Sequence, residues 1–180
     1  QLGLNIEEVL QQISNIYSAE GRFQTIKTPD NRTAVVDYAH TPDALENVLK
    51  TINSIRNNNE KVITVVGCGG DRDKEKRPKM AAIATNLSSQ VIFTSDNPRT
   101  EKAEDIIEDM IKDLDSVQKK KTLVITDRKQ AIKTACSLSN SGDIILVAGK
   151  GHEKYQEING EKFPFDDVIE LKESLNLKTI

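Results

Sequence analysis

The segment TSDNPRTE (94–101) gathers an acid, an amide and a guanidinium, Asp96, Asn97 and Arg99, around one proline. It follows an apolar run and precedes a helical pattern, which places it at the tip of a buried strand. An Asn-Pro pair is enough to make a turn, so the arginine is additional. Guanidinium groups bind carboxylates through paired hydrogen bonds. The segment therefore indicates a carboxylate-binding turn; the alternative is a plain turn with a solvated arginine.

A glycine-rich turn, GCGGDRDKEKRP (67–78), supplies a second arginine between a strand and a helix. Glycine N–H groups and a helix N-terminus favour anions. The spacing matches neither GxGxxG nor GxxxxGKS/T, so it does not identify a dinucleotide site or a P-loop. Arg72 is the residue that the glycines would hold at the sheet edge. A tight turn with solvated charges is the alternative interpretation.

The segment VVDYAHTP (35–42) ends a strand at Asp37 and brings His40 three residues later. An acid at a strand end can hold ribose hydroxyls or a metal-bound phosphate network. For His40, the residue pattern alone favours the interpretation that this histidine merely precedes the helix cap and has no chemical role.

The segment VAGKGHEKYQ (147–156) sets two glycines around Lys150, and His152 and Glu153 follow in a predicted loop. A catalytic His–Glu pair is one interpretation. No serine or cysteine is placed as a nucleophile, so the pattern does not favour hydrolase chemistry.

These motifs need a scaffold that brings strand ends together. Continuous apolar strands alternate with amphipathic helices, which predicts an α/β fold: a Rossmann-like, mostly parallel sheet with helices on both faces. Ligands bind such sheets beyond the carboxyl ends of the strands, where all four motifs fall. Strands are predicted at 33–39, 61–67, 90–95, 121–127 and 143–149, with another beginning at 23–26, and helices at 41–55, 76–87, 103–114, 128–139 and 166–175.

The composition is that of an ordinary soluble domain. The chain has 180 residues, 37% hydrophobic and 29% charged, with a net charge of −3 and interspersed signs. Nothing suggests a nucleic-acid stripe or a membrane-spanning helix. Two cysteines without metal-ligand spacing indicate a reducing compartment and no structural zinc.

The first residues predict a helix at 5–17, and Gly21 breaks the pattern. We expect a domain seam at 19–22. Because the chain opens at Gln1 inside a helical pattern, we also expect it to be a piece of a longer protein.

Five segments occur in one order along the chain: GRF, VVDYAHTPDALENVL, GCGGDRDKEKRPKMAAIA, TSDNPRTE and GKGHEKYQ. Together they resemble the C-terminal domain of the Mur ligases, and most closely of the diaminopimelate-adding type. The resemblance implies that residues 1–20 are the last helix of the central ATPase domain with its linker. Residues 21–180 would be the C-terminal, amino-acid-binding domain.

The resemblance implies a cytoplasmic, monomeric, three-domain enzyme of peptidoglycan synthesis. In that family ATP phosphorylates the D-glutamate γ-carboxylate of UDP-MurNAc-L-Ala-D-Glu, and the amine of meso-diaminopimelate attacks the acyl phosphate. The central domain carries a P-loop, a carbamylated lysine and Mg²⁺, and the N-terminal domain holds the UDP-sugar. This chain has no P-loop, so on its own it should not catalyse the reaction.

The family motifs carry over residue by residue, as binding sites rather than as catalytic or metal-ligating residues of this chain. For ATP, held mainly by the central domain, they imply Arg22, Asp37, His40 and Asn47. For diaminopimelate they imply Arg72, Asp96, Asn97, Pro98, Arg99, Gly149 and Glu153.

Two other hypotheses remain open from the sequence. A stand-alone nucleotide-binding module would bind NAD or ATP at micromolar concentrations. A non-catalytic amino-acid sensor would bind diaminopimelate tightly without a partner domain. Calorimetric titration of the chain with all three ligands separates these hypotheses from the ligase domain.

Overall fold

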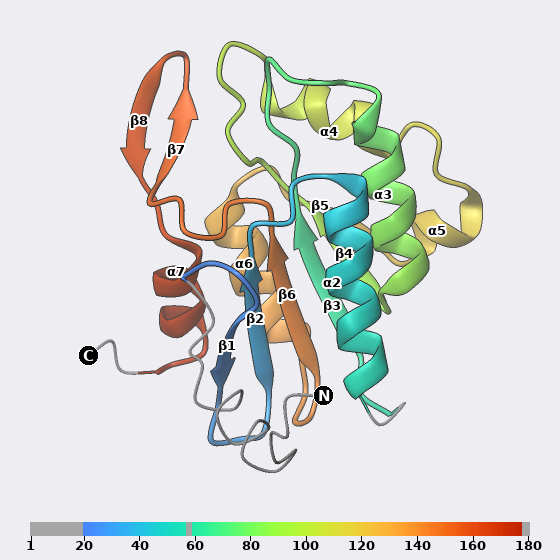
Figure 1. Ribbon diagram of the computed structural model, residues 1–180, viewed down its shortest axis with the longest axis vertical. Helices are drawn as coiled ribbons and strands as arrows, with labels where there is room; N and C mark the ends of the chain where they lie inside the picture. Colours follow the sequence, from blue (N-terminus) through green and yellow to red (C-terminus); the bar gives the residue numbers. More distant parts are fainter. Residues whose placement is uncertain (1–19, 57–58, 178–180) are drawn as a thin grey trace, which may run out of the picture.

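A six-stranded sheet runs through the centre of the computed structural model, in the order β1-β2-β6-β3-β4-β5 (Figure 1). The structure describes residues 20–56 and 59–177, so the helix predicted at 5–17 lies outside the described residues. Within this sheet β1 pairs antiparallel with β2, and the other pairings are parallel. The strands are β1 (Gln24–Lys27), β2 (Thr33–Asp37), β3 (Val62–Val66), β4 (Gln90–Phe93), β5 (Thr122–Val124) and β6 (Ile144–Ala148).

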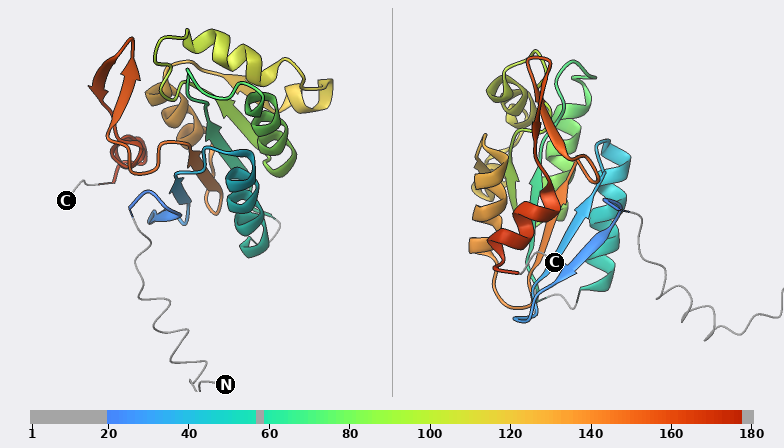
Figure 2. Two further views of the ribbon diagram at one scale, coloured as in Figure 1. Left: turned by 45° about the horizontal axis from the view of Figure 1, so that its top comes forward. Right: turned by 90° about the vertical axis from the view of Figure 1, so that its left-hand side faces the viewer.

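Helices cover both faces of this sheet, as the sequence predicted. Side chains alternate across each strand, so Val62 and Val66 of β3 face one core while Ile63 and Val65 face the other. The first core is closed by α2, α3 and α4, and the second by α6 and α7; the right-hand view of Figure 2 shows α2 and α6 on opposite sides. The helices are α2 (Pro42–Ile55), α3 (Lys76–Leu87), α4 (Ala103–Ile111), α5 (Ser116–Lys120), α6 (Arg128–Leu138) and α7 (Asp167–Ser174).

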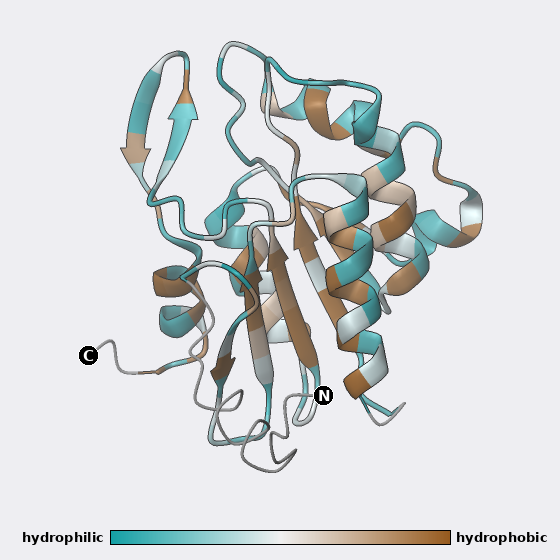
Figure 3. Ribbon diagram, viewed as in Figure 1, coloured by the Kyte–Doolittle hydropathy of each residue, from teal (hydrophilic) through white to brown (hydrophobic). Residues whose placement is uncertain are grey.

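The strands are apolar because both of their faces are covered. Every residue of β3 and β6 is buried, and both strands are brown for most of their length in Figure 3. This continuous burial is typical of parallel sheets. Within the described ranges, no helix has the length and apolar character needed to cross a bilayer.

Side-chain caps fix where several helices begin. Thr41 accepts a hydrogen bond from the Ala44 amide at 3.3 Å, and Pro42 occupies the first turn of α2. Asp127 and Asp166 cap α6 and α7 in the same way. These caps hold the loops before the helices, which form the carboxyl edge of the sheet.

Two elements were not predicted from the sequence: the short α5 and an antiparallel hairpin of β7 (Tyr155–Ile158) and β8 (Glu161–Pro164). The hairpin lacks apolar alternation, since β8 is exposed throughout. Its one signal is the turn pair Asn159-Gly160, both at positive φ. In Figure 1 the hairpin extends beyond the carboxyl edge of the sheet.

Candidate functional site

A cleft of about 380 Å³ opens at the carboxyl edge, beyond β2, β3, β4 and β6. Six of the seven residues predicted to bind diaminopimelate line it, together with His40. Pro98 lines a neighbouring cleft instead and supports the turn from outside. The cleft is lined by Tyr38, His40, Thr41, Gly67, Cys68, Gly69, Arg72, Asp73, Lys76, Asp96, Asn97, Arg99, Gly149 and Glu153.

One wall of the cleft is acidic and closely hydrogen-bonded. Asn97 Nδ2 donates to Glu153 Oε2 at 2.7 Å, and Asn97 Oδ1 accepts from the Glu157 amide at 3.0 Å. Asp96 lies beside this pair and is largely buried. A side chain at Gly149 would place its Cβ 2.5 Å from Asp96 Oδ2, so the backbone of residue 149 lies directly against the carboxylate. The wall therefore has fixed carboxylates that could receive an ammonium group.

Three basic side chains also line the cleft, Arg72, Lys76 and Arg99. Lys76 Nζ donates to the His40 carbonyl at 2.8 Å. Arg72 is exposed and donates to the Asp71 carbonyl at 3.0 Å, without a carboxylate partner among the described residues. Its guanidinium is thus available to an incoming carboxylate.

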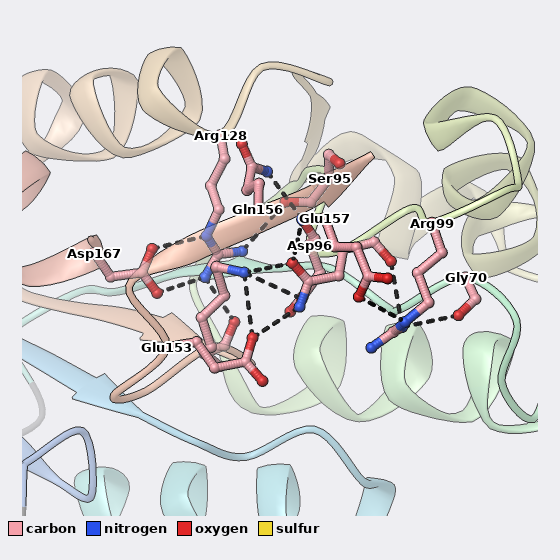
Figure 4. Close-up of polar contacts among 12 residues, drawn as sticks. Gly70, Ser95, Asp96, Arg99, Arg128, Glu153, Gln156, Glu157 and Asp167 are labelled. Atoms are coloured by element: carbon pink, nitrogen blue, oxygen red, sulfur yellow. Dashed lines mark hydrogen bonds and ion pairs between the residues drawn. The ribbon is translucent and has the colours of Figure 1, made fainter. Parts of the chain in front are cut away.

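Arg99 is more constrained than Arg72. Its Nη1 donates to the Gly70 carbonyl at 2.9 Å, and its Nε lies 3.3 Å from Glu157 Oε2 (Figure 4). The backbone of Arg99 has a φ of 53° and exchanges hydrogen bonds with β7 through the Glu157 carbonyl and the Asn159 amide. The unpredicted hairpin therefore holds this arginine at the cleft. The carboxylate that Arg99 contacts lies on the hairpin, not on α4 or the loop before it.

The glycine turn is tied to the Asp96–Arg99 turn by a buried arginine that the sequence analysis did not single out. Arg77 forms ion pairs with Glu101 at 2.7 Å and with Asp109 at 2.9 Å. Glu101 also accepts from the Asp71 amide at 2.6 Å. Hydrogen bonds from Arg77, opposed by partial burial, lower the pKa of Glu101 from its ordinary 4.5 to about 2.

This pKa shift predicts acid sensitivity. A carboxylate with a depressed folded pKa stabilises the fold above pH 4.5, and this stability is lost as the pH falls toward 2. We expect Glu101→Gln to reduce the decline in the free energy of unfolding across this pH window. Urea titrations at several pH values measure it, with Glu104→Gln, an exposed acid of α4, as the matched control. An unchanged slope in Glu101→Gln would contradict the prediction.

A second, shallower hollow of about 330 Å³ lies on the other side of Tyr38 and is lined by three of the four predicted ATP residues, Arg22, Asp37 and His40. Asp37 Oδ2 accepts from the Phe23 amide at 2.7 Å, so this acid also fixes the turn before β1. Asn47 is exposed on α2, one turn beyond Ala44, and does not line the hollow.

The aromatic ring of Tyr38 separates the two hollows. It lies 4.6 Å from the ring of His40 and 5.0 Å from the ring of His152, measured between centroids. Burial and the nearby carboxylates of Glu153 and Asp96 raise the pKa of Tyr38. The described residues contain no cluster of three or more His, Cys, Asp or Glu side chains that could hold a metal ion.

Two glycines, Gly21 just before β1 and Gly151 in the loop after β6, bring these two segments into contact. A Cβ on Gly21 would lie 2.0 Å from the His152 amide nitrogen, and one on Gly151 would lie 2.5 Å from the Gly21 carbonyl oxygen. Both residues have positive φ, at 70° and 53°. Backbone therefore packs directly on backbone between the GRF segment and the GKGHE segment.

Comparisons with known proteins relate nearly the whole chain to one enzyme family. A family model described as "Mur ligase, glutamate ligase domain" matches residues 21–151. The chain is 57% identical over 176 residues to a UDP-N-acetylmuramoyl-L-alanyl-D-glutamate--2,6-diaminopimelate ligase of Bacteroides fragilis, covering 98% of this chain and 36% of that protein. A protein of the same name from Halalkalibacterium halodurans is 46% identical over 173 residues, with coverage of 96% and 35%.

Solved structures give the same result for the fold. A structure of a UDP-N-acetylmuramoyl-L-alanyl-D-glutamate--2,6-diaminopimelate ligase matches with a TM-score of 0.82 and 45% identity, covering 97% of this chain and 35% of that one. The UDP-N-acetylmuramate-alanine ligase of Thermotoga maritima matches with a TM-score of 0.61 and 18% identity over 97% of this chain and 34% of that one, a likeness of fold. The chain spans about a third of the length of the curated relatives it matches.

Proposed function

The chain belongs to the Mur ligase family, and from this premise we propose that it is the C-terminal domain of a ligase adding meso-diaminopimelate to UDP-MurNAc-L-Ala-D-Glu. Residues 21–180 form the amino-acid-binding domain, and residues 1–20 belong to the end of the central ATPase domain and its linker. The relatives' names and their identity over nearly the whole chain support the substrate assignment.

The observation that carries the proposal is that acidic and basic side chains line one cleft. A free amino-acid end presents an ammonium and a carboxylate, and the cleft offers Glu153 and Asp96 to the first and Arg72 and Arg99 to the second. Charge-assisted hydrogen bonds of this kind are short and directional. The far end of diaminopimelate would be fixed in the cleft, which leaves its other amine neutral and directed toward the acyl phosphate.

The remaining chemistry is assigned to the absent domains. When bound by the central domain, ATP would supply the phosphoryl group that activates the γ-carboxylate, and Mg²⁺ would supply charge neutralisation. In this chain Arg22, Asp37 and His40 would approach the nucleotide from the edge beside Tyr38, and Asn47 would approach it from the exposed face of α2. We propose that the metal ligands come from the central domain, that the enzyme acts as a monomer in the cytoplasm, and that this chain alone is inactive.

The proposal is tested with the full-length ligase and the 180-residue chain side by side. The full-length enzyme should release ADP in a reaction that requires both diaminopimelate and the UDP-MurNAc dipeptide, and the chain should show no turnover. Calorimetry should detect negligible ATP binding to the chain, which has no phosphate-cradling loop. Low-micromolar ATP binding, or diaminopimelate binding as tight as the full-length enzyme's, would overturn the domain assignment in favour of a nucleotide module or an amino-acid sensor.

Arg22 provides a separate prediction about the nucleotide edge. It is exposed immediately after Gly21, at the seam between the proposed domains. Domain closure would bring its guanidinium over the nucleotide and exclude water. We expect Arg22→Ala to lower kcat of the full-length ligase by roughly 10²-fold, the scale of losing one electrostatic contact in the transition state. The melting temperature should not change, with Lys27→Ala on exposed β1 as the control; an unchanged rate at saturating ATP would remove Arg22 from the mechanism.

A further inference from the structure

Lys150, between the two glycines of GKGHE, is a lysine with no exposed surface. Burying an ammonium is costly unless the group is paired and hydrogen-bonded. The substrate assignment above gives this residue no role, and its side chain cannot reach solvent. Because Lys150 lies beside the acidic residues that line the cleft, its role is sought in what it does to them.

The Lys150 ammonium is surrounded by the acidic wall of the cleft. Its Nζ donates to Asn97 Oδ1 at 2.8 Å and to Glu153 Oε2 at 3.3 Å, and it lies 3.8 Å from Asp96 Oδ1. The ring of Tyr155 lies 5.6 Å from the same nitrogen. One cation therefore joins the end of β6, the turn after β4 and the start of the hairpin. Figure 4 labels Asp96 and Glu153 within the same cluster of polar contacts.

The contacts also exclude chemistry at the nitrogen itself. An ammonium has three protons to donate, and three oxygen acceptors lie within 3.8 Å. Two of these contacts are hydrogen bonds and the third, to Asp96, is an ion pair, and a buried ammonium held in this way is poorly placed to act as a nucleophile. Lys150 can act only through the groups that it holds.

Charge indicates what Lys150 does to those groups. Asp96 and Glu153 share this one internal cation, so the cluster keeps one net negative charge. That charge matches a single substrate ammonium. Without Lys150 the two carboxylates would repel each other, and Asn97 would lose one of the two donors that fix its Oδ1.

We infer that Lys150 is a positioning residue for amino-acid recognition, which holds Asn97 and Glu153 in place and sets the acidic wall to one unit of negative charge. The inference rests on the proposed function for its substrate, but the geometry is a property of this chain alone. Lys150 acts as an internal counter-ion behind the cleft, and the recognition residues in front of it depend on its charge.

The first test measures stability in the 180-residue chain and needs no substrate. Lys150→Met should lower the melting temperature by roughly 3–12 °C, the scale expected for losing hydrogen bonds to charged groups. Adding Glu153→Gln removes the unbalanced charge, so the double variant should melt above the Lys150→Met single variant. If Lys150 only fills space, the melting temperature of the double variant will be equal to or lower than that of the Lys150→Met single variant, which would contradict the inference. Lys162→Met is the matched control, because Lys162 lies 4.2 Å from the same Tyr155 ring but is exposed.

The second test measures recognition in the full-length ligase. Lys150→Met should raise KM for diaminopimelate by roughly 10–100-fold, as expected when binding groups are misplaced, and leave KM for ATP within about threefold. Loss of kcat with unchanged KM for diaminopimelate would overturn the inference. If the unmodified ligase does not use diaminopimelate at all, the proposed function fails, while the melting series still decides the role of Lys150.

Discussion

Replacing Arg99 by alanine in the full-length ligase is expected to raise KM for meso-diaminopimelate by about 10²–10³-fold while KM for ATP changes little. Arg99 and Arg72 both line the cleft, and in the proposed function their guanidinium groups bind the far carboxylate. L-Lysine has the same reach but lacks that carboxylate, and sites built to bind a polar group reject analogues without it by roughly 10⁴-fold when fully buried. Arg72 is exposed and Arg99 is 20% exposed, so we expect a selectivity of about 10²–10⁴.

The same variant should narrow the preference for diaminopimelate over lysine. Alanine keeps a Cβ at the positive φ of residue 99, so the backbone strain is unchanged and the effect reports the guanidinium. Arg99→Lys is the control that keeps the positive charge but removes the paired N–H donors of the guanidinium. A fall in melting temperature with unchanged amino-acid preference would show that Arg99 only anchors its turn to Gly70 and Glu157. Among the described residues, neither Glu101 nor Glu104 forms a hydrogen bond or ion pair with the Arg99 side chain, so Gly70 and Glu157 are the contacts that such an anchor would use.

The largest expected effect on stability is at Arg128. Its guanidinium forms two hydrogen bonds of 2.8 Å with the Asp167 carboxylate and one of 3.1 Å with the Ala148 carbonyl. Both side chains are completely buried. Arg128→Met leaves the Asp167 charge unpaired, which should cost about 3–5 kcal/mol of the free energy of unfolding. That is a large part of the roughly 5–15 kcal/mol available to a domain, and urea denaturation of the chain measures it.

The double variant Arg128→Met with Asp167→Leu serves as the internal control. Replacing both charges by apolar groups is often neutral, so the double variant should regain most of the lost stability. Figure 4 shows the Arg128–Asp167 pair and the Arg99 contacts at opposite ends of the drawn cluster. A double variant as unstable as the single one would mean that Arg128 stabilises the fold through the Ala148 carbonyl rather than through Asp167.

The fold could be predicted because its signals are local. Buried strands such as 143–149 are continuous apolar runs, and helix starts such as Thr41-Pro42 carry their caps within four residues. The hairpin and α5 were missed because neither buries an apolar face: β8 is fully exposed, and α5 has no buried residue. Their signals were the Asn159-Gly160 turn and the capping box of Asp115 with Gln118.

The cleft could be predicted only in part. Motifs at strand ends identified the residues that line it, because parallel strands end at one edge. The pairs that hold those residues join segments far apart in sequence: Lys150 with Asn97 across 53 positions, and Arg128 with Asp167 across 39. Nothing in a single sequence connects such positions, since each partner alone has the pattern of an ordinary polar or charged surface residue. Burial, which decides the role of Lys150, is visible only in the folded chain.

The contact between Gly21 and Gly151 restricts how this protein family can diverge. A Cβ on Gly21 would strike only backbone atoms, and one on Gly151 would strike the Gly21 carbonyl oxygen at 2.5 Å and the Cβ and Cα of Tyr38, so shortening a neighbouring side chain would not make room for a larger residue. We therefore expect each glycine to resist substitution on its own, because a change at one position cannot be compensated by a change at the other. A homologue that carries another residue at one of them must have rebuilt the path of its main chain there. In such a homologue, we expect the segment before β1 and the loop after β6 to pack against each other in a different way.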